Sequence, residues 1–322
     1  MAQFDFPLEQ LQGYISEATA PHDFAAFWQE TLMQTRMHPL EPRFAALETP
    51  LQTLEAFDVT FNGYAGQPIK GWLMLPKQRN ASLPCIVEFV GYGGGRGLAT
   101  DHLLWASCGF AHLVMDTRGQ GSSWSCGDTP DLTPDGDNPQ HPGFMTRGIL
   151  HPETYYYRRV FIDAVRAIAA AKSHPAINPN RIAVIGGSQG GGLAIAAASL
   201  EPSVLAVAPD VPFLSDFARA TQITNSDPYG EIVRYLKVQR GREAQVFGTL
   251  NYFDAQHFAA STTCAALYSV ALMDEICPPS TVFAAYNRHA GTKQIVVYPY
   301  NNHEGGGAHH TKRKLEFMQM LW

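Results

Sequence analysis

The sequence predicts an α/β fold built on a mostly parallel, doubly wound sheet. Two observations support this prediction. Short apolar runs alternate with helical patterns, and one run ends in a glycine-flanked serine that leads directly into a helix. Uninterrupted apolar runs are typical of parallel strands buried on both faces, and their alternation with helices is typical of right-handed crossovers. The 322 residues are 45% hydrophobic and 16% charged, which suits a single domain, residues 1–322, with a sizeable core.

The first segment, residues 1–50, is predicted to be an N-terminal helical extension. Phe24, Phe27, Trp28 and Leu32 recur at the spacing of one helix face. An aromatic stripe of this kind could be a ligand platform, but such stripes usually pack against a core, and we favour core packing.

From residue 55 the pattern changes to strands. Two alternating runs, 57–61 and 69–75, are separated by a glycine-containing turn and predict an antiparallel hairpin. Two later stretches interrupt the alternation of strands and helices. Residues 119–152 read as a long loop, and residues 210–262 read as a lid-like helical insertion before a late strand. The runs predicted as buried strands are 85–90, 111–115, 182–185, 265–270 and 295–298.

The densest motif is Gly186-Gly-Ser188-Gln-Gly190, which follows the apolar run 182–185 and precedes a helical pattern. Strand, sharp turn and helix are the context in which G-x-S-x-G forms a nucleophile elbow. The turn exposes the serine hydroxyl at a helix N-terminus, where developing negative charge is favoured. A glycine-rich turn that binds a phosphate, or binds nothing, is the alternative interpretation.

A nucleophilic serine needs a histidine base and a carboxylate that orients it. In α/β-hydrolases these follow in the order serine, acid, histidine. Asp274 directly follows the run 267–273, with Glu275 as a rival acid, and His303 follows a late strand and precedes a run of glycines. Order and position therefore predict the triad Ser188, Asp274 and His303 on an α/β-hydrolase fold.

The oxyanion of an acyl-transfer reaction needs two hydrogen-bond donors. One is expected from the backbone N–H of Gln189, the residue after the nucleophile. The other is expected from Tyr92, in the glycine-rich loop 91–95 after an early strand, although this loop could also be a flexible turn. Arg118, in Arg118-Gly-Gln120, is predicted to be a buried structural tie and not a catalytic group.

Composition excludes several functions. With 23 basic and 29 acidic residues the net charge is −6, which argues against nucleic acid or an anionic membrane as partner. The five scattered cysteines indicate free thiols in a reducing compartment, and no His/Cys/carboxylate group has the spacing of a metal site. The sequence has neither a secretory signal nor an apolar run long enough to span a membrane, so we expect a cytoplasmic protein without metal or cofactor.

The motifs together resemble carbohydrate esterase family 7, the acetyl xylan esterases and cephalosporin C deacetylases. The three that carry the resemblance are Arg118-Gly-Gln120, Gly186–Gly190 and His303-Glu304. Further segments that resemble the family extend the similarity over essentially the whole chain. They are 4–11, 24–28, 142–149, 154–159 and 278–286.

The resemblance implies a single α/β-hydrolase domain that removes acetyl groups from short xylo-oligosaccharides, other small acetyl esters and cephalosporin C, without a metal. It also implies a homo-hexamer, a trimer of dimers, in which residues 119–152 form an oligomerisation loop. The implied triad is Ser188, Asp274 and His303, the implied oxyanion donors are Tyr92 and Gln189, and the implied walls of the acetyl pocket are Tyr92, Phe213, Pro228 and Ile276.

Two other functions compete with this interpretation. A serine peptidase or a long-chain lipase can occupy the same fold, because a fold does not fix the reaction. A catalytically dead α/β-hydrolase could act as a binding module. The intact triad argues against the binding module, and the lack of a broad apolar lid pattern argues against the lipase.

Overall fold

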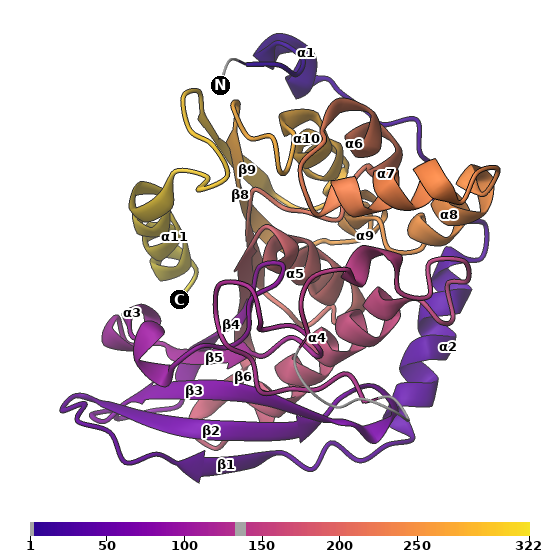
Figure 1. The fold of residues 1–322 in the computed structure, drawn as a ribbon. Helices are drawn as coiled ribbons and strands as arrows, with labels where there is room; N and C mark the ends of the chain where they lie inside the picture. Colours follow the sequence, from indigo (N-terminus) through magenta and orange to yellow (C-terminus); the bar gives the residue numbers. More distant parts are fainter. Residues whose placement is uncertain (1–2, 133–139) are drawn as a thin grey trace.

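The computed structural model describes residues 3–132 and 140–322. Its centre is a nine-stranded sheet in the order β1-β2-β3-β5-β4-β6-β7-β8-β9 (Figure 1). The pairs β1–β2, β2–β3 and β3–β5 are antiparallel. The remaining pairs are parallel: β5–β4, β4–β6, β6–β7, β7–β8 and β8–β9. The strands are β1 (Arg43–Ala46), β2 (Leu54–Asn62), β3 (Pro68–Pro76), β4 (Leu83–Phe89), β5 (Ala111–Met115), β6 (Ile177–Gly187), β7 (Ala206–Asp210), β8 (Ala265–Ala271) and β9 (Lys293–Tyr298).

Helices cover both faces of this sheet, as the doubly wound prediction requires. In β4, Cys85 and Val87 enter the larger core with α4 and α5, while Ile86 points to the smaller core with α3 and α11. Figure 1 shows α3 and α11 on one side of the sheet and α4, α5 and α10 on the other. The helices are α1 (Leu8–Gln12), α2 (Phe24–Arg36), α3 (Leu104–Ser107), α4 (Tyr156–Ser173), α5 (Gln189–Leu200), α6 (Phe217–Ile223), α7 (Tyr229–Val238), α8 (Glu243–Leu250), α9 (Ala255–Ala259), α10 (Pro279–Arg288) and α11 (Gly307–Leu321).

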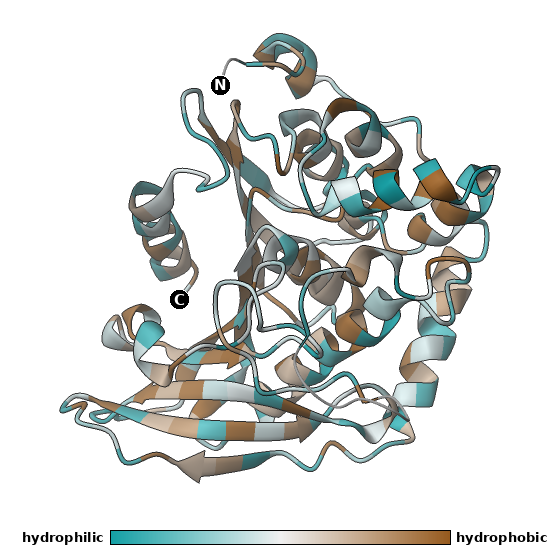
Figure 2. Cartoon of the chain, viewed as in Figure 1, coloured by the Kyte–Doolittle hydropathy of each residue, from teal (hydrophilic) through white to brown (hydrophobic). Residues whose placement is uncertain are grey.

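The hydropathy of the chain explains this arrangement. Figure 2 shows hydrophobic segments gathered along the central strands, with hydrophilic segments on the peripheral loops and helices. Strand β5 is buried at every position, as its nearly continuous apolar run predicts. Among the helices of the described residues, none has the combination of length and apolarity needed to cross a membrane.

The N-terminal segment differs in part from the predicted helical extension. Helices α1 and α2 form, but residues 43–46 form β1, an edge strand paired antiparallel with β2. The aromatic stripe packs into the core as expected: Trp28 is buried and stacks on Phe161, with ring centroids 5.6 Å apart.

The insertion predicted at residues 210–262 lies between β7 and β8, but β7 itself was not among the predicted strands. Residues 206–210 form β7, a central strand between β6 and β8, so the insertion follows Asp210. The segment between β7 and β8 then carries α6, α7, α8 and α9. A proline is rarely found in a central strand, and Pro209 therefore hid β7 from the sequence pattern.

The long loop predicted at residues 119–152 contains the short 3₁₀ helix Phe144–Thr146 and a bridge between Ser122 and Cys126. Residues 133–139 of this loop, which the resemblance assigns to oligomerisation, lie outside the described residues. The described parts on either side pass over the carboxyl ends of the parallel strands, where several of their side chains enter a cavity.

Candidate active site

Ser188 lies in the turn between β6 and α5. Its backbone has φ 55° and ψ −119°, a conformation that is costly for a residue with a side chain. The flanking glycines allow the turn to pack closely. A Cβ on Gly186 would lie 2.3 Å from the carbonyl carbon of Gly190, and a Cβ on Gly190 would lie 2.0 Å from the carbonyl oxygen of Phe89. The geometry is that of a nucleophile elbow.

Asp274 and His303 meet at the ends of β8 and β9. His303 Nδ1 donates a hydrogen bond to Asp274 Oδ2 at 2.8 Å. The other oxygen of Asp274 accepts the backbone N–H groups of Ile276 at 2.8 Å and Cys277 at 2.9 Å. A carboxylate only accepts, so this contact places the proton on Nδ1 and leaves Nε2 available for proton exchange. The rival acid Glu275 does not take this position.

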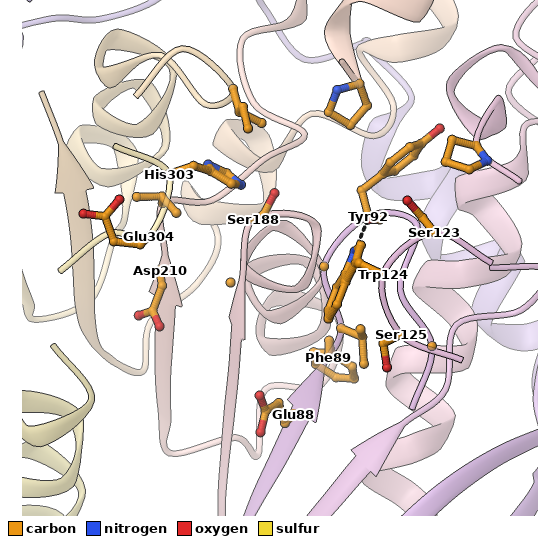
Figure 3. Close-up of a pocket in the computed structure, with 18 of the residues that line it drawn as sticks. Glu88, Phe89, Tyr92, Ser123, Trp124, Ser125, Ser188, Asp210, His303 and Glu304 are labelled. Atoms are coloured by element: carbon orange, nitrogen blue, oxygen red, sulfur yellow. Dashed lines mark hydrogen bonds between the residues drawn. The ribbon is translucent and has the colours of Figure 1, made fainter. Parts of the chain in front are cut away.

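The side chain of Ser188 opens into the same cavity as His303 (Figure 3). Its Oγ lies 3.9 Å from Cys277 Sγ, and within the described residues no hydrogen bond joins it to His303. Hydrogen bonds between catalytic groups often tighten only when substrate binds. Burial raises the pKa of the Cys277 thiol well above its usual value, so the thiol stays neutral and is at most a weak donor.

The sequence predicted no group with metal-ligand spacing, but the fold brings one together. Ligand atoms of Asp274, Cys277 and His303 lie within 4.8 Å of one another. The group is a poor fit for a metal, because Asp274 and His303 use their facing atoms in a mutual hydrogen bond. Metals bind the thiolate, which the raised pKa of Cys277 disfavours.

The two expected oxyanion donors lie on adjacent segments. Gln189 begins α5, and its side-chain Nε2 donates to the carbonyl of Val90, beside Tyr92, at 3.1 Å. Across residues 3–132 and 140–322, neither the backbone N–H of Tyr92 nor that of Gln189 finds an acceptor. Two unused backbone donors beside a nucleophile are what an oxyanion hole requires.

A second glutamine joins these two segments. Gln120 Oε1 accepts the N–H of Gly93 at 2.7 Å, and Gln120 Nε2 donates to Gln189 Oε1 at 2.8 Å. Tyr157 donates to the same Gln189 oxygen at 2.8 Å. Gln120 and Gln189 are fully buried, so these hydrogen bonds are protected from water and fix both segments.

The side chain of Tyr92 extends away from the elbow toward α7. Its hydroxyl donates to Glu231 Oε1 at 2.6 Å and accepts the N–H of Phe144 at 2.9 Å. Glu231 Oε2 in turn accepts the N–H of Met145 at 3.1 Å. Burial raises the pKa of both Tyr92 and Glu231. The loop with the candidate oxyanion donor is therefore bound to the insertion and to the 143–145 loop.

The cavity above Ser188 has a volume of about 910 Å³. Tyr92, Pro228 and Ile276 line it, as the resemblance implied. Phe213, the fourth implied wall, does not: it is fully buried and packs behind Tyr92, with ring centroids 6.3 Å apart. Its role in shaping the pocket is therefore to support Tyr92 from behind.

Two half-buried carboxylates, Glu88 and Asp210, also line the cavity, and each contacts a buried basic side chain. Glu88 Oε2 is 2.8 Å from His112 Nε2, and Asp210 is paired with Lys314. Burial opposes ionisation of Glu88 and Asp210, but the hydrogen bonds and charges of their partners outweigh it, so the pKa of each carboxyl lies below its usual value. Both carboxylates line the cavity and stay ionised at neutral pH.

Arg118 is the structural tie that the sequence predicted. It is fully buried, and its guanidinium donates from Nε and Nη2 to the two oxygens of Asp163, with Nη2 at 2.8 Å from Oδ1. A bidentate pair of this kind is strong and directional. The carbonyl of Arg118 accepts the Tyr156 hydroxyl, which positions the loop that carries Gln120.

Two residues of the site were missed by sequence reasoning. Trp124 lines the cavity and donates from Nε1 to the carbonyl of Tyr92 at 2.8 Å. A tryptophan within a glycine- and serine-rich loop was a signal that could have pointed to it. Glu231 had no such signal, because its contact with Tyr92 joins positions 139 residues apart.

The elbow, the Asp274–His303 pair and the mostly parallel sheet together define an α/β-hydrolase. A family model described as acetyl xylan esterase (AXE1) matches residues 1–321. The chain therefore belongs to the acetyl xylan esterase family, a family of carboxylic ester hydrolases.

Individual proteins that are similar to this chain are acetyl xylan esterases or acetyl esterases. The acetyl xylan esterase from Paenibacillus sp. R4 is 38% identical with a TM-score of 0.88, covering 98% of this chain and 99% of that chain. Acetyl xylan esterase 1 from Thermoanaerobacterium sp. JW/SL YS485 is 32% identical with a TM-score of 0.88, and the match covers 99% of this chain and 100% of that chain. The acetyl esterase Axe7A of Xylanibacter ruminicola is 27% identical over 310 residues, which are 94% of this chain and 66% of that longer protein.

Proposed function

We propose that this protein hydrolyses small acetyl esters through an acetyl-enzyme formed on Ser188. The observation that carries the proposal is the 2.8 Å contact of His303 Nδ1 with Asp274 Oδ2 beside the strained Ser188. It supplies a nucleophile, a base in a fixed tautomer and an orienting carboxylate in one cavity.

Each residue has a defined role in the reaction. As Ser188 Oγ bonds to the acetyl carbon, His303 Nε2 takes the hydroxyl proton, and the carbonyl oxygen becomes an oxyanion that accepts the N–H groups of Tyr92 and Gln189. Collapse of the intermediate breaks the bond to the alcohol oxygen, which receives the proton from His303. Water then attacks the acetyl-enzyme in the same way, releasing acetate and restoring Ser188.

The preferred acyl group is acetyl. Tyr92, Pro228 and Ile276 crowd the side of the cavity next to Ser188, and Phe213 supports Tyr92 from behind. A larger acyl chain has to displace these packed side chains, and overpacking a close-packed wall costs roughly 1–3 kcal/mol. We expect activity to fall sharply beyond propionate.

The alcohols that we propose are short xylo-oligosaccharides and other small compounds, including cephalosporin C. Support comes from the similarity to acetyl xylan esterases over 98% or more of the chain. We also propose a cytoplasmic protein that works without a metal. Its free cysteines fit a reducing compartment, and the Asp274, Cys277 and His303 group is a poor metal site.

The function is tested with p-nitrophenyl esters from acetate to octanoate beside a peptide substrate. Acetate preference supports the acetyl esterase, octanoate preference a lipase, peptide cleavage a peptidase, and no turnover a binding module. Product analysis on acetylated xylo-oligosaccharides and cephalosporin C then ranks the alcohols. Activity lost on exhaustive chelation and recovered with a divalent ion would contradict the metal-free mechanism.

We further propose that the protein assembles as a hexamer, a trimer of dimers with inward-facing sites, as the family resemblance implies. Light scattering measures the assembly. If the sites face an inner cavity, intact acetylated xylan should react far more slowly than its oligosaccharides. A monomer with equal rates on both would contradict this part of the proposal.

A further inference from the structure

We infer that Trp124 is a stacking platform for the sugar ring of the substrate's alcohol, in a subsite for neutral acetylated pyranosides. The inference rests on the proposed esterase function and adds to it the residues that select the alcohol. Ser188 and the acyl wall account for only one half of an acetylated sugar. The remaining part of the cavity is lined by Trp124 and by carboxylates.

Trp124 is unusual in its exposure. The residue is 64% exposed, although tryptophans in this chain such as Trp28 and Trp105 are almost fully buried. Part of its exposed surface lines the cavity that also contains Ser188. Figure 3 shows its ring between Tyr92 and Ser125, with Ser188 across the cavity. An exposed indole beside a nucleophile offers an apolar face to whatever is joined to the reacting ester.

The platform is held in place by the loop beneath it. The ring packs so closely on Gly94 that a Cβ there would lie 2.3 Å from its Cζ2, and a Cβ on Gly91 would lie 3.5 Å from the same atom. Its Nε1 donates to the carbonyl of Tyr92 at 2.8 Å. A side chain fixed on one face and at its polar edge loses little conformational freedom on binding, so its open face can stabilise a ligand efficiently.

The surroundings of the ring suit hydroxyl groups. The Ser125 hydroxyl lies next to Trp124, Glu88 lies at the base of the cavity, and Asp210 lies across it near Glu304 (Figure 3). Partners behind the cavity fix both carboxylates, because Glu88 contacts His112 and Asp210 contacts Lys314. Each carboxylate has more lone pairs than these contacts use and can accept hydrogen bonds from sugar hydroxyls.

Charge defines the class of ligand further. None of the described residues that line the cavity is lysine or arginine, whereas five are carboxylates. An anionic alcohol, such as that of cephalosporin C with its ring carboxylate, meets these carboxylates without a lysine or arginine to compensate, so we expect it to bind less well than a neutral sugar. An apolar face with carboxylate acceptors around it fits a neutral pyranose ring, whose C–H face is apolar and whose edge carries hydroxyls.

The experiment compares two acetyl esters in one enzyme. Methyl β-D-xylopyranoside monoacetate carries a pyranose ring, and ethyl acetate carries none. We expect Trp124→Ala to lower the ratio of kcat/KM for the xyloside to that for ethyl acetate by about tenfold. Trp124→Phe, which keeps an aromatic face, should recover most of the ratio. Leu98→Ala is the matched control, because Leu98 is 62% exposed on a neighbouring segment and does not line the cavity.

The outcomes separate this inference from the proposed function. If the wild-type enzyme hydrolyses neither ester, the proposed function is wrong. If it hydrolyses both and Trp124→Ala lowers the two activities equally, the indole only holds the Tyr92 loop and the platform is wrong. Methyl β-D-xylopyranoside gives an independent readout as a competitive inhibitor of ethyl acetate hydrolysis. Its Ki should rise about tenfold in Trp124→Ala and stay unchanged in Leu98→Ala, and an unchanged Ki in Trp124→Ala also overturns the inference.

Discussion

The hydroxyl of Tyr92 donates a 2.6 Å hydrogen bond to Glu231 Oε1, and this contact joins the loop after β4 to α7 of the insertion. The backbone N–H of Tyr92 is the proposed oxyanion donor. Its position therefore depends on a side-chain contact made with a distant segment of the chain. The insertion contributes to the precision of the site as well as to its walls.

Breaking this contact should slow the chemical step more than it weakens binding. Tyr92→Phe and Glu231→Ala are each expected to lower kcat about tenfold with little change in KM, because an oxyanion donor acts mainly in the transition state. Glu231→Gln keeps an acceptor for Tyr92 and should retain more activity. Steady-state kinetics on p-nitrophenyl acetate measures both constants.

Two controls accompany this prediction. The double variant Tyr92→Phe with Glu231→Ala should be no slower than the worse single variant, because both remove one contact. Glu243→Gln, at an exposed position of the same insertion, should leave kcat unchanged. Fully additive effects, or a rise in KM alone, would count against a positioning role for Glu231.

Ser188→Ala should abolish ester hydrolysis and leave the fold intact. Removing a triad nucleophile lowers turnover by about 10⁴-fold or more. Circular dichroism checks the fold, and a serine-directed covalent inhibitor should label Ser188 in the wild-type protein. Near-wild-type turnover in the purified variant would refute the assignment.

Asp274→Asn should lower kcat by about 10⁴-fold, because the amide no longer fixes His303 with its proton on Nδ1. Glu275→Gln is the matched control, since the neighbouring carboxyl does not contact the His303 ring in the described residues. Kinetics of the two variants on the same acetyl ester compares them. If Glu275→Gln proved the more damaging change, the acid of the triad would have to be reassigned.

Ile276→Ala should broaden the acyl preference. Ile276 lines the cavity at the acyl end, and shortening it makes room for about three carbon atoms. One methylene in an apolar pocket is worth about 1–3 kcal/mol, so the butyrate-to-acetate ratio of kcat/KM should rise at least tenfold. Phe213→Leu, behind the wall, should change this ratio less. An unchanged ratio in Ile276→Ala would place the acyl group elsewhere.

His257 should make stability depend on pH. Burial, followed by the charge of Arg288, lowers the pKa of His257 to about 4. Between the usual value of 6.5 and about 4, the unfolded chain binds the proton and the folded chain does not, so stability is lost as the pH falls through this window. The slope is at most about 1.4 kcal/mol per pH unit.

Urea denaturation between pH 4 and pH 8 measures this dependence. His257→Gln should reduce the slope below pH 6.5, and the remaining slope should come from groups such as His174 and His289, whose pKa values burial also lowers. His309→Gln, at an exposed position, should leave the curve as it is in the wild type. An identical slope in wild type and His257→Gln would show that His257 is not the group responsible.

The strands that could be predicted are those whose own residues show a clear hydrophobic pattern. Strand β5 was recognisable because its residues are apolar except for His112 and all are buried. Strand β7 was missed because Ala206-Val-Ala-Pro-Asp210 is short and contains a proline, and only its neighbours β6 and β8 make it a strand. The edge strand β1 was missed because its four residues are mostly exposed and depend on β2 for pairing.

In the candidate site, too, the residues that could be predicted are those with a local sequence signal. Ser188, Asp274 and His303 were predictable because each follows a strand, and parallel strands bring their carboxyl ends to one edge of the sheet. Trp124 and Glu231 depend on how loops and the insertion fold back over that edge. Such contacts between distant segments leave no periodic pattern in the sequence, and Phe213 was placed in the wrong layer for the same reason.

The contact of Gly190 with the carbonyl of Phe89 limits how this enzyme can change. Because the elbow touches β4 itself, the distance from the nucleophile to the loop after β4 is set by the spacing of neighbouring strands, which hardly varies among sheets. Mutation cannot adjust that distance gradually. New substrates have to be acquired at the cavity walls, by replacing side chains such as Ile276 or Trp124, while the reactive centre keeps its dimensions.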